Sequence, residues 1–422
     1  MNRTSAINLA VRFGALVAIG FYVGTAHLTR GHEADFGKQW LAARLVATGQ
    51  GKCLFDLDVQ RAELEKHFDR EVIDHGIWRE GIGGPTYPPT LGVGFSPLGW
   101  LAPRWAQWVL VEISVLAVLL AAWQLSRTAA RGVTWELCVL ATLSFPGFFL
   151  AMGVGQNSAL SLAVFVAGWT LLARDREFAA GAVWGLFAIK PTWGLAVAWL
   201  PAAVGRPRAY LGMVCSSLAL VVLTLPFCGL DAWFDWLTVA RSTEHFYQTL
   251  PRWTDLSRDL PGLLRRIDQG NAVEIAGWAT VLLVLFVTTW MWRRQRLTRI
   301  HHAASAGTAM LLAGAILTCP RFMFYDMTLA VVPFLIALGG WRDMTTKSRW
   351  VFGFLCGLLW IGTAYCYLNW TMVGPPLDTL ALLGLWVWSI SQQQFSKIYG
   401  LTDRDESSHG IEHEPEFVAA TF

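Results

Sequence analysis

Long apolar runs recur along this chain, and they restrict it to a fold embedded in a membrane. They lie at approximately 11–28, 106–126, 133–151, 157–173, 178–190, 192–204, 209–227, 273–292, 303–319, 324–340, 350–368 and 377–391. A helix that crosses a bilayer needs about 20 mainly apolar residues. Charged residues make up only 15% of the chain, whereas soluble domains carry roughly 25%. We therefore predict an all-α, polytopic bundle of about twelve transmembrane helices.

Charges between the runs predict how the chain is threaded. Alternate gaps are rich in cations, namely Arg127, Arg131, Arg174, Arg176, Arg206, Arg208, Arg293, Arg294, Arg296, Arg299, Arg342, Lys347 and Arg349. Short loops of this kind stay in the cytoplasm. The rule places both termini in the cytoplasm and the intervening gaps on the outer side. The gap at 229–272 falls outside although it also carries arginines.

The same pattern divides the chain into parts. A membrane domain covers 1–395, with large outer loops at 27–105 and 229–272, and a polar tail at 396–422 has a composition that predicts disorder. We interpret 11–28 as an anchor. A signal peptide is the alternative, but no small-x-small cleavage site follows.

A short apolar stretch, YPPTLGVGFSPLGWLAP, lies in the first outer loop. It is too short to span a bilayer, and its prolines favour a hairpin or a surface-lying element. Tyr87 and Trp100 fit the role of interface anchors.

One acidic residue, Asp35, opens an amphipathic stretch soon after the first apolar run. Four apolar side chains at helical spacing predict one stripe: Phe36, Trp40, Leu41 and Leu45. The polar residues on other faces are Lys38, Gln39 and Arg44. We expect this helix to lie along the bilayer surface and to hold the carboxylate at the membrane boundary. Asp35 could act there as a general base, or it could cap the helix.

Several function classes are disfavoured by composition and spacing. A formal net charge of only +3 gives no electrostatic footprint for nucleic acid. The seven cysteines lack metal-ligand spacing, and those in apolar runs resemble small hydrophobic residues: Cys138, Cys215, Cys319 and Cys356. The outer-loop histidines are interpreted as surface residues rather than metal ligands: His67, His75 and His245.

Three segments together resemble glycosyltransferase family 87, the polyprenol-phosphate-mannose-dependent mannosyltransferases of the C-type membrane glycosyltransferase fold. They are TYPPTLGVGFSPLGWL, GQNSALSLAVFVAGWTLLARDREFAAGAVWGLFAIKP and CPRFMFYDMTLAVVPFL, and they follow an acidic residue at the start of the first outer loop. The resemblance covers roughly residues 30–340. It implies an inverting transferase with a lipid-phosphate sugar donor and a catalytic aspartate on the outer face.

Carried onto this sequence, the resemblance assigns the catalytic base to Asp35, with Glu33 beside it as a possible second proton acceptor. Fixed cations should face the charge that develops on the leaving phosphate. The candidates for this phosphate-binding role are Lys190, Arg265, Arg266 and Arg321. The candidates for binding the sugar or the acceptor are Gln156, Asn157, Tyr325 and Asp326.

Each candidate also has a structural alternative. Lys190 could reach the membrane interface with its long side chain. The two loop arginines could pair with Asp259 or Asp268. The segment GVGQN could be only a glycine-rich turn, and Asp326 could favour a helix N-terminus.

The sequence therefore predicts a hexosyltransferase of the inner (plasma) membrane. We expect it to move a hexose, with mannose favoured, from a polyprenyl-phosphate sugar to a lipid or glycan acceptor outside the cytoplasm. No cofactor or metal site is predicted, and a divalent metal held by outer-loop acids stays open. The alternatives are a transporter or flippase of lipid-linked saccharides and a non-catalytic assembly partner.

Overall fold

The structure is a computed structural model that describes residues 3–28, 34–78, 82–249, 255–268, 270–295, 300, 305–368 and 375–398. Within these residues the regular structure is helical, apart from one isolated antiparallel bridge between Ser257 and Met323. The prediction of an all-α fold is therefore confirmed for the described part of the chain. The predicted tail at 396–422 lies almost wholly outside it.

Each predicted apolar run contains helix. The first half of the chain forms α1 (Arg3–Thr25), η1 (Ala26–Leu28), α2 (Ala34–Ala47), η2 (Gly51–Cys53), α3 (Leu57–Leu64), α4 (Arg70–Val72), η3 (Ile73–Ile77), α5 (Pro89–Gly99), α6 (Pro103–Arg127), α7 (Trp135–Leu143), α8 (Pro146–Val154), α9 (Ser158–Ala173), α10 (Glu177–Gly185), η4 (Leu186–Ile189), α11 (Pro191–Ala198) and α12 (Leu200–Ala203). The second half forms α13 (Arg208–Cys228), α14 (Asp231–Thr249), α16 (Leu260–Arg265), α17 (Asn271–Arg293), α18 (Ser305–Leu317), η6 (Phe324–Ala330), α19 (Val331–Gly339), η7 (Trp341–Asp343), α20 (Thr346–Leu368) and α21 (Leu377–Ile398).

Four helices of the described chain are long and apolar enough to cross a membrane, namely α1, α6, α13 and α17. Helices α7 and α8 form one further candidate that is bent by 56°. The helices α9, α18 and the α10–η4, α11–α12 and η6–α19 pairs are apolar but shorter. The chain is therefore a helical membrane protein, and the count of about twelve spans remains a prediction.

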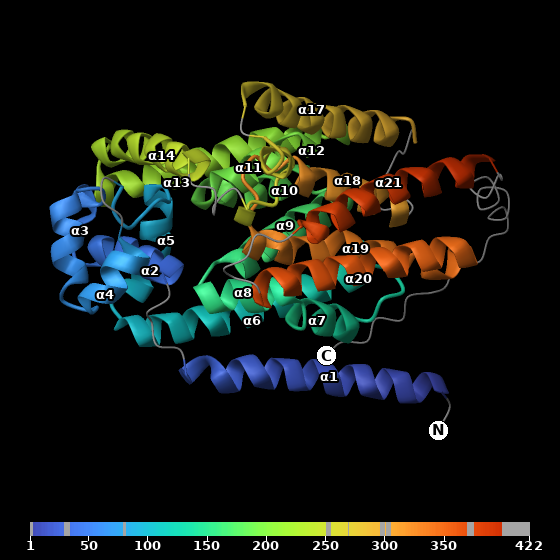
Figure 1. The fold of residues 1–422 in the computed structure, drawn as a ribbon, viewed down its shortest axis with the longest axis horizontal. Helices are drawn as coiled ribbons and strands as arrows, with labels where there is room; N and C mark the ends of the chain where they lie inside the picture. The colour runs from blue at the N-terminus through green and yellow to red at the C-terminus, as the bar shows by residue number, and fades with distance from the viewer. Residues whose placement is uncertain are drawn as a thin grey trace, which may run out of the picture.

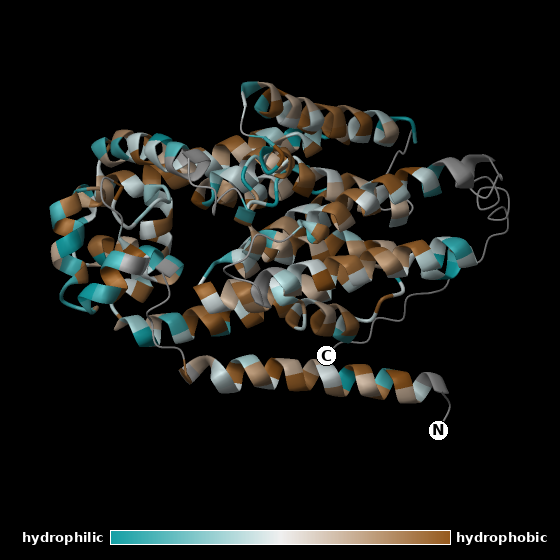
Figure 2. Ribbon diagram, in the orientation of Figure 1, coloured by the Kyte–Doolittle hydropathy of each residue, from teal (hydrophilic) through white to brown (hydrophobic). Residues whose placement is uncertain are grey.

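The polar part of the molecule gathers at one end. In Figure 1, α2 to α5 stack at the left, α1 runs below the other helices, and α20 and α21 lie towards the right. Figure 2 shows α3 and α4 as the most hydrophilic helices in this end, whereas the long helices are mainly apolar. Large apolar side chains are exposed along α1, α13 and α17. These surfaces suit contact with lipid.

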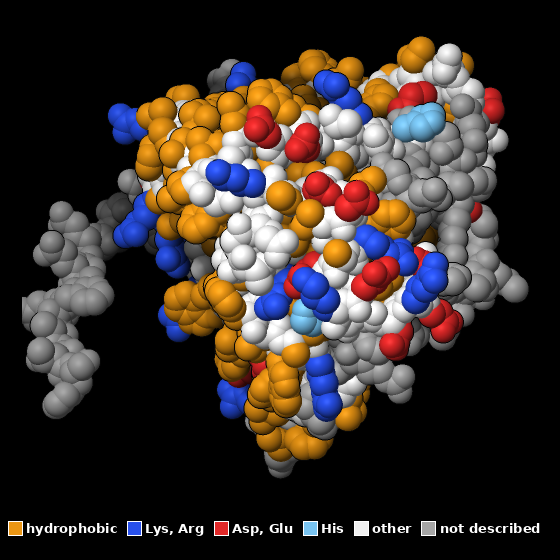
Figure 3. Space-filling model, turned by 90° about the vertical axis from the view of Figure 1, so that its left-hand side faces the viewer, with side chains coloured by type: hydrophobic (Ala, Val, Ile, Leu, Met, Phe, Trp, Pro, Cys, Tyr) orange, Lys and Arg blue, Asp and Glu red, His pale blue; other side chains and the backbone are white. Residues whose placement is uncertain are grey.

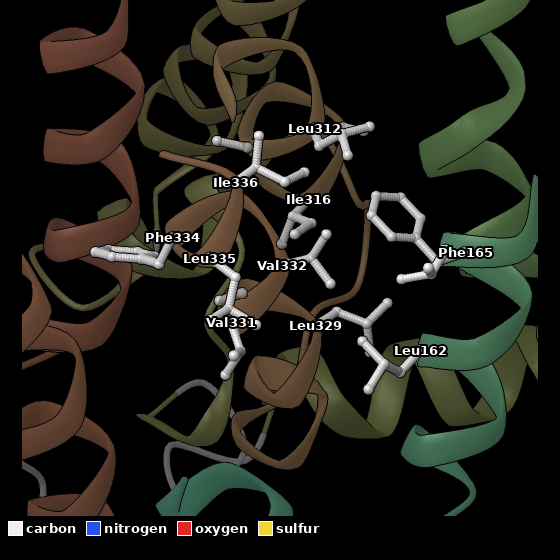
Figure 4. Close-up of a cluster of buried hydrophobic side chains, with 14 of the residues drawn as sticks. Leu162, Phe165, Leu312, Ile316, Leu329, Val331, Val332, Phe334, Leu335 and Ile336 are labelled. Carbon is white, nitrogen blue, oxygen red and sulfur yellow. The ribbon is translucent and has the colours of Figure 1, made fainter. Parts of the chain in front are cut away.

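The core of the helical bundle lies around the late helices. Side chains from α9, α18, η6 and α19 interdigitate, including Leu162, Phe165, Leu312, Ile316 and Val332 (Figure 4). All of them are buried. Because η6 carries candidate site residues and leads directly into α19, this packing fixes their position.

Helix α2 differs from its predicted setting. The apolar stripe is present, but side chains on the other faces, such as Lys38 and Gln39, are also buried. The helix packs against α3, α5, α6 and α8. The prediction of a helix was right. Its apolar stripe packs against protein, and its position relative to the bilayer surface remains a prediction. Its helical spacing alone could not distinguish lipid from protein as the apolar partner.

The short apolar stretch after Tyr87 is a single helix, α5, and not a hairpin. Pro88 and Pro89 set its start, since proline fits the first turn of a helix. It packs closely on α2, where a Cβ on Gly99 would lie 2.4 Å from the carbonyl oxygen of Ala43. Trp100 follows the helix and is 68% exposed, which fits its predicted place at an interface.

Replacement of Gly99 by alanine is expected to destabilise this contact, because the obstacle is main chain and cannot rotate away. The expected cost is about 1–3 kcal/mol. Gly94→Ala is the matched control in the same helix, since its Cβ would be 3.7 Å from the nearest atom, on Ile189. Thermal unfolding of both purified variants checks the prediction. Equal stability of the two variants would contradict the backbone contact between α5 and α2.

Candidate active site

Asp35 lies in the first turn of α2, and side chains hold both of its carboxylate oxygens. Gln156 Nε2 donates to Oδ2 at 2.8 Å, and Lys38 Nζ approaches Oδ1 at 3.4 Å. The Asp35 side chain is 23% exposed. The contacts that the structure describes for this carboxylate are with these two side chains, and α2 begins one residue earlier, at Ala34. A partly exposed carboxylate that is oriented from the protein side is suited to accept a proton from a bound molecule.

The orientation of Gln156 is determined by a second hydrogen bond. Tyr87 donates its hydroxyl proton to Gln156 Oε1 at 2.9 Å, which leaves the Gln156 amide nitrogen to face Asp35. Tyr87 is thus part of a polar network, which the sequence did not predict, and its role as an interface anchor remains a prediction. It joins the start of α5 to the start of α9.

The turn between α8 and α9 brings Gln156 to α2. Gly155 ends α8 with φ +71°, and a Cβ there would lie 2.3 Å from Phe36 Cβ. Only glycine meets both the left-handed backbone and the close approach. Gln39 then closes the contact, because its Nε2 donates to the Gly155 carbonyl at 2.8 Å. The segment GVGQN is therefore a glycine turn and also a link to Asp35.

A second charged pair lies on the other side of this turn. Lys190 Nζ donates to Asp326 Oδ1 at 2.6 Å, and the two side chains are 10% and 1% exposed. Ser158 Oγ donates to the same oxygen at 3.0 Å. Lys190 also lies 5.3 Å from the centre of the Tyr325 ring. The interface-reaching alternative for Lys190 was wrong, because its ammonium is inside the protein.

The N-terminal turn of α9 connects the two charged pairs. Gln156 contacts Asp35, and Ser158, two residues further on, contacts Asp326. Between them, Asn157 is buried, and its Oδ1 has no hydrogen-bond partner in the described structure. Six candidates from four distant parts of the sequence thus meet at one place: Asp35, Gln156, Asn157, Lys190, Tyr325 and Asp326.

Sequence reasoning missed four members of this network: Lys38, Gln39, Tyr87 and Ser158. Lys38 carried a usable signal, because a lysine three residues after an aspartate on a helix lies on the same face. The other three had no comparable signal, since their partners lie far away in the sequence. Glu33, the suggested second proton acceptor, lies outside the described residues.

The loop arginines have other partners than predicted. Arg265 forms a two-pronged ion pair with Glu274 of α17, at 2.6 and 2.9 Å. Arg266 donates to the carbonyl oxygens of Asp255 and Ser257. The contacts that the structure describes for Arg265 and Arg266 are with Glu274 and with main chain, and the charge of Arg265 also acts on Asp259. These contacts brace the 255–268 segment, and a phosphate-binding role for either arginine remains a prediction.

A buried ion pair fastens this segment to the first turn of α21. Arg258 Nε donates to Asp378 Oδ2 at 2.9 Å, with both side chains almost fully buried. The backbone nitrogen of Arg258 donates to the Phe322 carbonyl at 2.5 Å, next to half-buried Arg321. The 255–268 segment is thereby joined to the strand-like connection that leads to Tyr325. Nothing in the sequence indicated that Arg258 and Asp378 would meet.

The pKa values of two loop carboxylates are shifted in opposite directions, for different reasons. Burial raises the pKa of Asp259, although Ser257 and the Gly262 amide donate hydrogen bonds to it. Burial also acts to raise the pKa of Glu63, but hydrogen bonds from Lys66 and Arg44 outweigh it and the pKa is lowered. Both carboxylates therefore have hydrogen-bond partners within the protein that explain why they are found in their partly or fully buried positions.

The described histidine, cysteine and acidic side chains are dispersed. No group of three or more histidine, cysteine, aspartate or glutamate side chains there is arranged to hold a metal ion. His67 packs its ring on Trp40, with 4.9 Å between ring centres. His245 is exposed, and the side chain of His75 lies outside the described set.

The fold and the site define a helical membrane protein with a charged, hydrogen-bonded centre near its polar end. A family model, Glycosyltransferase family 87, matches residues 86–320. This match covers more than half of the chain, so the protein belongs to glycosyltransferase family 87 and is a membrane glycosyltransferase. Searches of curated proteins and of solved structures gave no match. The matched residues include Gln156, Asn157 and Lys190, whereas Asp35, Arg321, Tyr325 and Asp326 lie beyond them.

Proposed function

We propose that this protein is an inverting hexosyltransferase that uses a polyprenyl-phosphate sugar as donor and Asp35 as general base. The acceptor would be a lipid or glycan hydroxyl on the outer side of the plasma membrane. Mannose is favoured because the sequence motifs resemble mannose-transferring members of the family. No cofactor is assigned a role.

The reaction needs one proton transfer and one displacement. The acceptor hydroxyl gives its proton to Asp35 while its oxygen bonds to the anomeric carbon of the sugar. The bond from that carbon to the phosphate oxygen breaks, and its electron pair leaves with the lipid phosphate. The phosphate goes from a diester with one charge to a monoester with up to two. A base contributes typically about 10²–10⁴ in rate, and cations stabilise the departing charge.

One observation carries this proposal: a partly exposed carboxylate and a buried ion pair lie at the two ends of the same short turn. Asp35 is partly exposed and is oriented by Gln156. The Lys190–Asp326 pair lies at the other end of the same turn. Lysine near the site supplies positive charge for the leaving phosphate, and the amides of Gln156 and Asn157 suit hydrogen bonding to sugar hydroxyls.

The proposed side of the membrane agrees with the charge pattern of the polar end. Figure 3 views this end and has basic and acidic side chains side by side on its surface. They include ion pairs of Arg61 with Glu65 and Asp74, and the Arg61 hydrogen bond lowers the pKa of Asp74. Such a surface belongs in water. With the arginine-rich gaps in the cytoplasm, it faces outward.

A transfer experiment tests the proposal. Purified full-length protein is incubated with polyprenyl-phosphate hexoses that carry a radiolabelled sugar, together with candidate lipid and glycan acceptors. We expect label to move from the donor to an acceptor, with mannose the preferred sugar. In sealed vesicles, label that stays on the donor but crosses the membrane would instead indicate a transporter and would overturn the proposal.

A further inference from the structure

We propose that Lys38 is shared between Asp35 and the phosphate of the lipid donor, so that donor binding releases the catalytic carboxylate. This inference rests on the proposed function and adds a phosphate-binding residue and an order of events to it. It differs from the sequence-based assignment, which gave the phosphate to Lys190 and to three arginines.

The two lysines of the site are paired to very different degrees. Lys190 Nζ lies 2.6 Å from Asp326, an ordinary or short distance for a charged hydrogen bond. Lys38 Nζ lies 3.4 Å from Asp35, which is long for such a pair. The Asp326 carboxylate is held further by a hydrogen bond that it accepts from Ser158. Of the two ammonium groups, that of Lys38 is therefore held by the longer and weaker contact.

The burial of Lys38 makes this incomplete pairing costly. The residue is only 5% exposed, and the single carboxylate contact at 3.4 Å satisfies one of its three N–H groups. A buried ammonium without close partners is unfavourable unless another ligand completes it. The structural alternative is a helix-surface pair three residues apart, but such pairs stabilise exposed helices, and this one is enclosed.

The charge balance of the site indicates which ligand fits. The two carboxylates and two ammonium groups leave no net charge, so the phosphate of a donor must compete with a carboxylate for a cation. The weaker pair, Lys38 with Asp35, is the one in which a phosphate oxygen will replace the carboxylate as partner of the lysine. When a phosphate oxygen binds Lys38, Asp35 keeps its Gln156 contact and its second oxygen becomes available to the acceptor hydroxyl. The donor would then bind before the acceptor is activated.

Equilibrium binding of farnesyl phosphate, a short polyprenyl monophosphate, tests this inference without any sugar transfer. Farnesol is the phosphate-free control ligand. We expect Lys38→Met in the full-length protein to weaken farnesyl phosphate at least about tenfold and to leave farnesol unchanged. Lys38→Arg should recover part of the affinity. Lys66→Met, an exposed lysine of the same outer loop, should have no effect.

Asp35→Asn provides the sharper measurement, because it removes the competitor of the phosphate. It should tighten farnesyl phosphate binding by about twofold to fivefold, which is the range expected for loss of a long, weak ion pair. The same substitution in the Lys38→Met background should give no tightening. Lys38→Gln serves as a second neutral variant if methionine prevents folding.

Two results would overturn the inference. One is unchanged farnesyl phosphate affinity in both neutral Lys38 variants. The other is equal tightening by Asp35→Asn with and without Lys38, which would reflect a general charge effect. Neither result depends on catalysis. A failure of the proposed transferase function would appear in the label-transfer experiment instead.

Discussion

Replacement of Asp35 by asparagine is expected to abolish sugar transfer while the protein remains folded and inserted in the membrane. Asparagine has nearly the same shape and can still accept the hydrogen bond from Gln156, but it cannot take up the proton of the acceptor hydroxyl. The expected loss in turnover is about 10²–10⁴. Initial rates with a radiolabelled polyprenyl-phosphate hexose measure it.

The control for this substitution is Asp58→Asn, which changes an exposed aspartate on α3 in the same outer loop. It should retain full activity. An Asp35→Asn protein with rates near those of the wild type would remove the base assignment. A cysteine introduced at position 35 that is labelled only from the cytoplasmic side would contradict the outward-facing site.

Replacement of Lys190 by alanine is expected to have the second largest effect, and to act on both stability and turnover. It leaves the carboxylate of Asp326 buried without its cation, and breaking such a pair costs about 3–5 kcal/mol. The folded fraction should also transfer sugar more slowly, because a positive charge near the leaving phosphate is lost. Thermal unfolding and initial rates are measured on the same preparation.

A paired replacement separates these two effects. Lys190→Met together with Asp326→Asn removes both charges, so it should recover much of the stability that the single variant loses. We expect its turnover to remain low. Lys347→Ala, at an exposed lysine of α20, is the control for loss of a surface charge. Wild-type turnover in the paired variant would show that the ion pair is only structural.

The local sequence pattern was sufficient to predict where the helices of the apolar runs lie. The apolar runs are long, and proline or glycine ends many of them, so each contains helix where it was expected. The setting of α2 was not predictable in the same way. Its apolar stripe would suit lipid as well as protein, and only the position of α5 and α3 around it decides that protein covers both faces.

The candidate site was predicted in part because its residues are unusual where they stand. Lys190 interrupts an apolar region, and Asp326 begins one, so each attracts attention before its partner is known. That the two form a pair with each other, 136 residues apart, follows only from the fold. Arg258 and Asp378 show the same limit, since each alone resembles an ordinary loop charge.

By itself the sequence determined that this protein is a helical membrane protein, and it predicted that the unusual polar residues lie in the outer gaps, because hydrophobic length and the spacing of charges are local properties. The tertiary structure alone decided which charges share a site. It places Gln156 on Asp35 and Ser158 on Asp326 through a single turn of α9, and it leaves Lys38 with one long contact. Hydrogen bonds reach only about 3 Å, so their partners depend on how distant segments pack together.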